Sequence, residues 1–465
     1  MKRPSGLVLI RGRGKRGRVD DRRIGMNPIH QTSTESFYMS LTKTVGFFAG
    51  TTLAIGGAAF GADQTNYASE IASLKAEIAS LKSAQGDSWL TEQRASEIRG
   101  IVTDVLADAD TRASLQGSGA GAGYDGGFFL SSADGNYSMK INVLQQIRWS
   151  FNDDDSAVGG ESQSFGFENK RTRLTFSGNM VDSSWSYKVA YYFDSSNNPE
   201  NPGGGLSDAW VSKDFGNGFA MYAGQFKLPF GGEFGLDAGN LQFTDYSVAA
   251  ALLGPGYGQG LMLSYSADMF RVFGAYVNGL GEVNQNWGVG SPSTDWAFSA
   301  RGEFKLAGNW SQFSDAQSWK GEEFGAVIGA GYAIQRDDTA DETPWTFTLD
   351  AAVDFGGANI AAAYFMNDDD AGGEINAFTV SGGVFVADDI ELVARFENID
   401  VDGGPELNTL TGGGNWYFAK NTAKLGVEFG YAFDAIFTGD ATYANWVEST
   451  DDGQWVLRGQ MSFSF

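Results

Sequence analysis

The sequence contains no cysteine and only one histidine, His30, among its 465 residues. Without cysteine the chain can form neither disulfide bonds nor thiolate metal sites. His30 lies in an N-terminal segment that we expect to be removed, so the mature chain would have no imidazole. Because nucleophilic and transition-metal catalysis rely heavily on these side chains, the sequence argues against an enzyme. We expect no catalytic residue, no metal site and no cofactor.

Long apolar runs are also missing, since no stretch reaches the roughly 18 strongly apolar residues that a membrane-spanning helix requires. The nearest candidate, 45–62, is uncharged but diluted by glycine and threonine. Lys43 precedes it and small residues end it, a layout typical of a secretory signal peptide. We predict a signal peptide at 39–62 that begins at Met39. Residues 1–38 are then a basic extension or a wrongly assigned start, with a nucleic-acid-binding arm as the alternative.

Positive charge is scarce beyond that segment. After residue 62 the chain holds 22 Lys and Arg against 54 Asp and Glu, which gives a formal net charge of −32. Such a surface repels nucleic acid and keeps the water-facing parts of a protein hydrated. We therefore expect no nucleic-acid partner for the mature chain.

Helical periodicity is confined to 63–116. Its clearest part is the repeated heptad EIASLKAEIASLKS, whose apolar seam consists of Tyr67, Ile71, Leu74, Ile78 and Leu81. Residues of opposite charge flank the seam, as in parallel coiled coils: Glu70, Glu77, Lys75 and Lys82. We predict a coiled coil at 66–83; the alternative is one amphipathic helix lying on another surface. Two heptads are too short to be stable alone, so pairing would need a body that is already oligomeric. A second helix near 90–115 and a Gly/Ser linker at 117–123 should follow.

From residue 124 the periodicity changes to two. In 137–151 the odd positions are apolar or aromatic apart from one glutamine, and the even positions carry most of the polar and charged side chains. The pattern returns in 185–193, 345–354 and 424–433. Such alternation predicts strands with one apolar and one polar face.

The connections between these segments decide the fold. We count sixteen predicted strands; connections after odd-numbered strands are mostly long and polar, and those after even-numbered strands are mostly tight turns. The clear exception is the connection at 307–322. Long loops at one rim, short turns at the other and an even strand number are typical of an outer-membrane barrel. We predict an all-β transmembrane fold, a 16-stranded antiparallel barrel at 124–465, preceded by the short helical and coiled-coil segment at 63–116 on the periplasmic side.

The end of the chain adds a second signal. Its alternating apolar face consists of Trp455, Leu457, Met461, Phe463 and Phe465. This pattern resembles the assembly signal of outer-membrane proteins, in which Phe463 and Phe465 would contact the outer-membrane assembly machinery. The alternative is simply a last strand.

Several blocks resemble the phosphate-selective porin O/P superfamily: FENKRTRLTFSG, LSDAWVSKDFGNGFAMYAGQFKLPFG and YGQGLMLSYS followed by FRVFGAYVNGLG. The resemblance is specific over 123–281 and continues toward the C-terminus in strand layout. It implies a sixteen-stranded diffusion porin that assembles as a homotrimer, with the third long loop folded inward to narrow the pore.

That third loop, 229–259, stands out in composition as well. It contains the small and apolar stretch SVAAALLGPG, which is better explained by packing against the inner wall than by exposure to water. The alternative is a surface loop with a hydrophobic patch. Its only charged residues from 231 onward are acidic, Glu233, Asp237 and Asp245. Because phosphate selection should require Lys or Arg at the constriction, this departure from the family argues for weak phosphate preference.

Two further groups of residues have the parity expected of the lumen. The predicted pore-lining anion path consists of Lys140, Arg148, Arg171, Arg173, Lys188, Gln225 and Lys227. An opposing acidic wall would consist of Asp350, Asp354, Glu391, Glu397 and Glu428. Facing walls of opposite charge would set a transverse field across the pore; the alternative is that these charges pair and stiffen the barrel.

The sequence therefore predicts an outer-membrane porin for passive diffusion of small hydrophilic solutes and ions, with a weak preference for anions that could include phosphate. Expected partners are outer-membrane lipid, two further copies of the chain and the permeating solutes. The alternative function is a structural tether of the outer membrane, with the barrel mainly an anchor.

Overall fold

The computed structural model describes residues 72–77, 79–80, 121–153, 163–194, 205–284, 294–337, 341–370, 373–436, 446–447, 449–450 and 452–465. They belong to two separate units. In the first, 72–77 and 79–80 are helical. The predicted segments 1–38, 39–62 and 90–115, and most of the predicted coiled coil, lie outside the described residues. No helix in the described part of the chain is long and apolar enough to cross a membrane.

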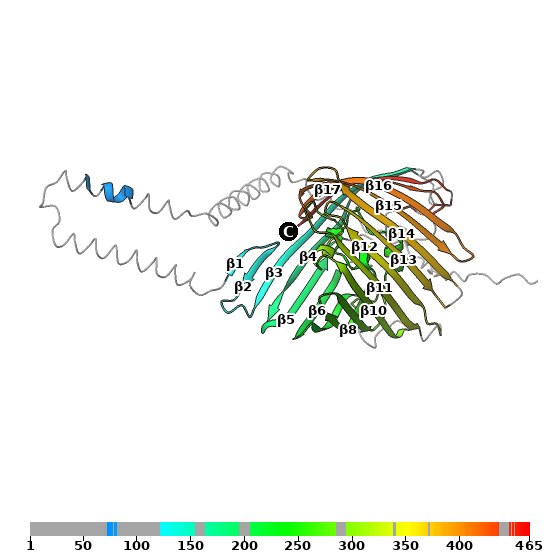
Figure 1. Cartoon of the computed structure of the whole chain (residues 1–465), viewed down its shortest axis with the longest axis horizontal. Coiled ribbons are helices and arrows are strands. Elements are labelled where there is room, and N and C mark those ends of the chain that lie inside the picture. Colours follow the sequence, from blue (N-terminus) through cyan, green and yellow to red (C-terminus); the bar gives the residue numbers. More distant parts are fainter. Residues whose placement is uncertain are drawn as a thin grey trace, which may run out of the picture. The chain divides into compact units, whose positions relative to one another are not determined.

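The second unit is a closed antiparallel barrel (Figure 1). Its sixteen described strands are β3 (Ser138–Asp153), β4 (Gln163–Met180), β5 (Asp182–Tyr192), β6 (Gly205–Gly216), β7 (Phe219–Lys227), β8 (Tyr257–Ser266), β9 (Phe270–Val277), β10 (Thr294–Ala307), β11 (Gly325–Asp337), β12 (Trp345–Asp354), β13 (Ala358–Asp368), β14 (Glu374–Phe385), β15 (Ile390–Val401), β16 (Glu406–Ala419), β17 (Ala423–Ala432) and β18 (Trp455–Ser464). Each pairs with the next, and β18 pairs with β3 from Trp455↔Asp153 to Ser464↔Leu144. The predicted 16-stranded barrel is confirmed.

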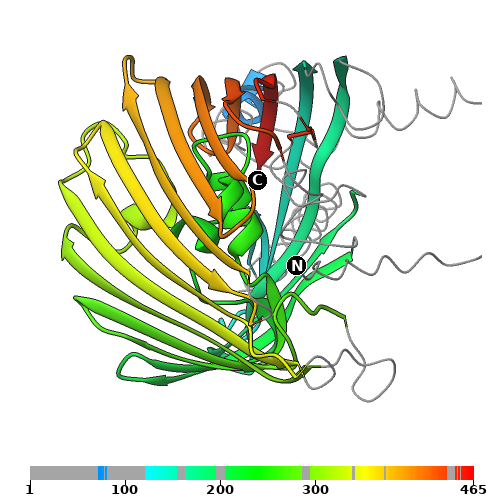
Figure 2. The same cartoon turned by 90° about the vertical axis from the view of Figure 1, so that its right-hand side faces the viewer.

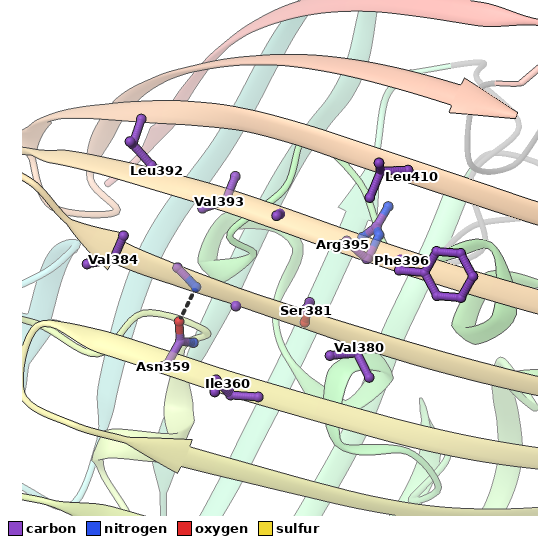
Figure 3. A pocket seen from close by; sticks show the side chains of 13 residues that line it. Asn359, Ile360, Val380, Ser381, Val384, Leu392, Val393, Arg395, Phe396 and Leu410 are labelled. Atoms are coloured by element: carbon purple, nitrogen blue, oxygen red, sulfur yellow. Dashed lines mark hydrogen bonds between the residues drawn. The ribbon is translucent and has the colours of Figure 1, made fainter.

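Side-chain alternation gives the barrel an apolar outside. Ile360, Leu392 and Leu410 are exposed on the outer face, whereas their neighbours Asn359, Val393 and Thr411 are buried inside. On the outer face of β13 to β16, small residues such as glycine leave a shallow apolar groove of about 560 Å³ between these large side chains (Figure 3). This is the surface expected to face lipid.

The two rims differ in the length of their connections. At one rim, which we call the short-turn rim, six connections have one to four residues. The turn between β6 and β7 is Asn217-Gly218, with φ of 53° and 85°, the left-handed values that a two-residue hairpin needs. The seventh connection there, 308–324, has 17 residues and includes η2 (Gln312–Ser314). It corresponds to the exception at 307–322.

The barrel is preceded by a β-hairpin, which the sequence analysis did not predict. It consists of β1 (Gly121–Tyr124) and β2 (Phe128–Ser131), so residues 121–123, which we assigned to the linker, are part of a strand. β2 pairs with residues 138–141 of β3, on the edge that β18 covers from residue 144 onward. Phe465 exchanges backbone hydrogen bonds with Val143 at 3.0 and 2.6 Å and its ring contacts Phe128 edge to face.

The longest described connection lies inside the barrel (Figure 2). This inner segment, residues 228–256, joins β7 to β8, because β8 begins at Tyr257 and not near 260 as predicted. It contains α4 (Gly232–Gly235), η1 (Ala238–Asn240) and α5 (Val248–Leu253). Its apolar side chains pack against lumen-facing residues of β13 to β17, which include Phe365, Ile399 and Leu407. The alanine-rich stretch is therefore part of a core.

Phe463 and Phe465 stay predicted assembly signals. Changing both to Ala should lower the yield of folded barrel in cells, because the terminal aromatic pattern would be lost. The readout is the fraction of protein that shows heat-modifiable mobility in gels. Phe429→Ala, which removes an exposed aromatic from β17, is the matched control. If the control lowers the yield equally, only apolar area matters and the terminal residues carry no signal.

Candidate functional site

The candidate site is the interior of the barrel, where the inner segment meets both halves of the wall. The half formed by β3 to β7 holds all the predicted basic residues, and the half formed by β12 to β17 holds the predicted acidic ones. The inner segment makes hydrogen bonds and ion pairs with both halves of the wall, so it is fixed across the lumen.

On the basic half, the carboxylate of Asp245 is the central group. Its oxygens lie 2.8 Å from Arg171 Nη2, 3.0 Å from Lys170 Nζ and 3.3 Å from Arg148 Nη2. Arg148 Nη2 also donates to the carbonyl of Thr244 at 2.7 Å. Burial alone would raise the pKa of Asp245, but Arg171, Lys170 and Arg148 outweigh it and hold the pKa well below its usual 3.8. One carboxylate thus ties three strand cations to the inner segment.

Lys170 was missed by the sequence analysis, and a β-bulge explains why. In the β3–β4 pair, Gln146 faces Arg171 and Ile147 faces Asn169, so Lys170 has no opposite residue. The extra residue turns Lys170 toward the lumen beside Arg171, although strict alternation would point it outward. Two consecutive basic residues in a strand were the only signal of such a bulge.

The other predicted basic residues are spread along the wall. Arg173 Nη2 lies 2.5 Å from Asp237, and Lys227 Nζ donates to the Leu236 carbonyl and the Tyr246 hydroxyl, both at 3.1 Å. Arg173 and Lys227 therefore hold the inner segment, as Arg148 and Arg171 do.

Three of the predicted residues do not hold the inner segment. Lys188 pairs with Asp208 on the neighbouring strand at 3.2 Å. Gln225 bonds to the carbonyls of Leu206 and Ser207 and to the backbone N–H of Asn284. Lys140 is eight positions from Arg148 along β3, about 27 Å for an extended strand, and lies beside the β1–β2 turn. The seven predicted residues therefore do not form one patch.

On the acidic half, four of the five predicted carboxylates accept hydrogen bonds from the inner segment. Glu397 accepts from Val248 N at the start of α5 at 2.7 Å, and Asp350 accepts from Gly232 N at 3.2 Å. Glu428 accepts from the backbone and hydroxyl of Thr244 at 3.0 and 2.6 Å, and Glu391 from the Gln242 amide at 2.7 Å. The contacts of Glu397 and Asp350 satisfy backbone donors that the segment's short helices leave free at their first positions.

The fifth carboxylate, Asp354, is buried at the last position of β12, and no hydrogen bond or ion pair joins it to the inner segment among the described residues. Glu233, in contrast, belongs to the segment itself: it accepts from Ser247 N at 3.0 Å and lies 3.5 Å from Arg395.

Arginines that the sequence analysis did not select neutralise this half. Arg301 makes a two-pronged contact with Asp350 at 2.7 and 2.8 Å, Arg395 lies 2.9 Å from Glu397, and Arg458 lies 2.9 Å from Glu428. In the predicted strands 294–306, 388–398 and 453–465, each arginine alternates with outward-facing apolar residues, which indicates a lumen-facing side chain. We considered basic residues only in the early strands and therefore did not select them. Three of the five predicted carboxylates are therefore paired with arginines that do not belong to the predicted basic group.

This geometry suits the passage of small solutes through the barrel. A closed barrel of sixteen antiparallel strands, with an apolar outside, a polar inside and a long segment within, defines an outer-membrane porin, which is a channel and not an enzyme. The family model of the phosphate-selective porins O and P matches residues 141–379, and the chain belongs to this family.

No curated protein matches the chain. Among solved structures, the anion-selective porin from Comamonas acidovorans is similar at 14% identity, with a TM-score of 0.48 and coverage of 70% of this chain and 99% of that one. OmpT of Vibrio cholerae is similar at 15% identity and a TM-score of 0.45, covering 74% and 99%. The channel DcaP of Acinetobacter baumannii is similar at 13% identity and a TM-score of 0.46, covering 70% and 97%.

Changing Asp245 to Asn should destabilise the barrel strongly, because three buried cations would lose their shared carboxylate. We expect a loss of about 3 to 5 kcal/mol in the free energy of unfolding, typical of a buried pair that loses one partner. Denaturant unfolding in detergent micelles measures it. Since the pKa of Asp245 is depressed, this contribution is fully present above about pH 5 and declines as the pH falls toward the folded-state pKa.

The matched control is Asp237→Asn in the same segment, where the carboxylate is partly exposed and faces Arg173. We expect it to cost less than Asp245→Asn, because Asp237 is partly exposed and faces one cation instead of three. Equal losses in the two variants would mean that the three-cation contact does not anchor the segment.

Proposed function

We propose that the chain forms a water-filled channel through which small hydrophilic solutes and ions diffuse, with a weak preference for anions. The observation that carries the proposal is the inner segment, which is bonded to both halves of the wall within a closed barrel. A segment fixed there narrows the lumen. It does not fill the lumen, because lumen-facing side chains such as Lys188 keep 29% of their surface exposed.

The preference for anions rests on the balance of charge in the basic half. Around Asp245, three cations face one inner-segment carboxylate, and Arg148 and Arg171 are fully buried. They would act on permeating ions through their field, which is less screened in a narrow pore than at an open surface. Lys188, which is partly exposed, would act by contact. Phosphate itself should be bound weakly, since the inner segment offers no Lys or Arg beyond residue 230.

We further propose that the chain is secreted through the signal peptide at 39–62, that 63–116 lies in the periplasm, and that the barrel assembles as a homotrimer. One structure of V. cholerae OmpT is described as a trimer form. The C-terminal strand would be the contact for the assembly machinery.

Deleting residues 240–255 should raise single-channel conductance in planar bilayers, because most of the inner segment would leave the lumen. The same deletion removes Asp245, so Arg148, Lys170 and Arg171 would face the pore and the reversal potential in a KCl gradient should move toward chloride. Unchanged conductance, with heat-modifiable mobility retained, would place the constriction elsewhere.

Deleting residues 63–116 should leave an oligomeric barrel of lower thermal stability. Two heptads are too weak to assemble a body on their own, so the predicted coiled coil would unite helices that the barrels already hold together. Size-exclusion chromatography with light scattering measures the oligomer, and heating in detergent measures its stability. A truncated protein that exists only as a monomer would show that the coiled coil creates the oligomer.

A further inference from the structure

The connection 308–324 is much longer than the other connections at the short-turn rim. The other six connections of the short-turn rim have one to four residues, and this one has 17. By the usual orientation of such barrels, the short-turn rim is periplasmic. A connection of this length is longer than a simple turn at that rim requires.

The connection lies against the inner faces of distant strands. Asn359 of β13 donates to the Ala316 carbonyl at 2.6 Å, and Trp319 packs against Phe385 and Tyr417 with ring centroids 5.3 and 4.9 Å away. The side chain of Gln317 is buried and accepts from Asn421, in the β16–β17 turn, at 2.8 Å. The connection thus leaves β10 and crosses the lumen to the inner faces of β13 to β17.

Its tip also joins the inner segment. Ala316 N donates to the Asn240 carbonyl at 3.0 Å, and the Gln317 amide donates to the Leu241 carbonyl at 3.1 Å. Lys424 of β17 donates to the same Leu241 carbonyl at 2.6 Å. The inner segment, the connection and the wall are therefore one continuous structure in the half bounded by β12 to β17.

Some lumen-facing side chains differ in burial between the two halves of the barrel. One such residue from each of β12 to β17 is buried: Thr348, Phe365, Thr379, Glu397, Thr411 and Glu428. One from each of β5 to β10 is only partly buried: Lys188, Trp210, Tyr222, Met262, Arg271 and Glu303. On β5 to β10 these six side chains therefore keep contact with water, although others on the same strands, such as Asp208, Gln225 and Ser299, are buried.

Arg271 lies where this accessible side approaches the short-turn rim. Its guanidinium stacks on Trp310 with its carbon 3.8 Å from the ring centroid, and Trp310 belongs to the connection itself. The Trp310 indole N–H donates to the Ala267 carbonyl at 3.1 Å, which fixes the ring. Arg271 keeps 28% of its side chain exposed, and Glu303 lies 3.9 Å away.

We propose that the 308–324 connection closes the β12–β17 half of the lumen at the short-turn rim and confines permeating ions to the β5–β10 side. There they pass Arg271, which Trp310 of the same connection holds in position, and Arg271 contributes to anion preference by direct contact. The proposal rests on the porin function and specifies its path. Cations that are buried under the inner segment, such as Arg171, act on a permeating ion only through their electric field. Arg271 is in direct contact with the ion.

Charge variants of Arg271 test the path in the full chain. In a KCl gradient, Arg271→Glu should lower the chloride-to-potassium permeability ratio at least about twofold, since a unit charge near a narrow aqueous path acts over only a few Å of water. Arg271→Gln should lower it less, and Arg271→Lys should preserve it. Lys213→Gln is the matched control, because Lys213 is a basic residue toward the same rim that lies over Trp185 on the outer face. An unchanged ratio in Arg271→Glu, or an equal change in the control, would overturn the path.

Replacing residues 309–323 by Asn-Gly tests the closure. Conductance should rise about 1.5-fold or more because the covered half would open to water, and unchanged conductance in a folded variant would overturn it. If the replacement does not fold, Trp310→Ala with Gln317→Ala loosens the connection near its start and at its tip and should raise conductance in the same direction. Failure of the porin function is distinct, because the unaltered protein would then form no channels at all.

Discussion

The interior of this barrel depends on the ion cluster around Asp245. Removing Arg148, Lys170 and Arg171 from water is costly, and three like charges in one place repel one another. Asp245 offsets that cost only because the inner segment holds its carboxylate within 3.3 Å of all three. The cluster therefore requires the segment to be inside, and the segment cannot leave without exposing or stranding the cations.

The opposite half achieves the same result with different chemistry. There the wall supplies carboxylates and the inner segment supplies donors, among them the free N–H groups at the start of α5 and near α4. Each of three carboxylates also has an arginine of the wall, on the same strand, the next strand or the next but one, so each is already neutralised within the wall. A segment without basic side chains can thus be held firmly by both halves, and its acidic composition follows from its anchoring and needs no role in selectivity.

The sequence revealed the barrel because strand alternation and connection length are local properties. The inward position of the segment could also be inferred, since SVAAALLGPG has no reason to be exposed. Side-chain pairing is different, because it depends on which strands come together across the lumen. Alternation alone therefore placed Lys140 and Arg148 on one face without separating them by depth, and the bulge at Lys170 reversed the parity of its neighbourhood. The later arginines were visible by parity and were overlooked because basic residues were considered only in the early strands.

The β1–β2 hairpin has a consequence for how the cylinder closes. β2 and β18 occupy the same edge of β3 end to end, with residues 138–141 taken by one and residues from 144 by the other. A strand that closes a barrel could in principle slide along its partner by two residues and keep its faces correct. Here a slide toward the hairpin would drive Phe465 into Phe128, so the hairpin blocks a shift of β18 in that direction.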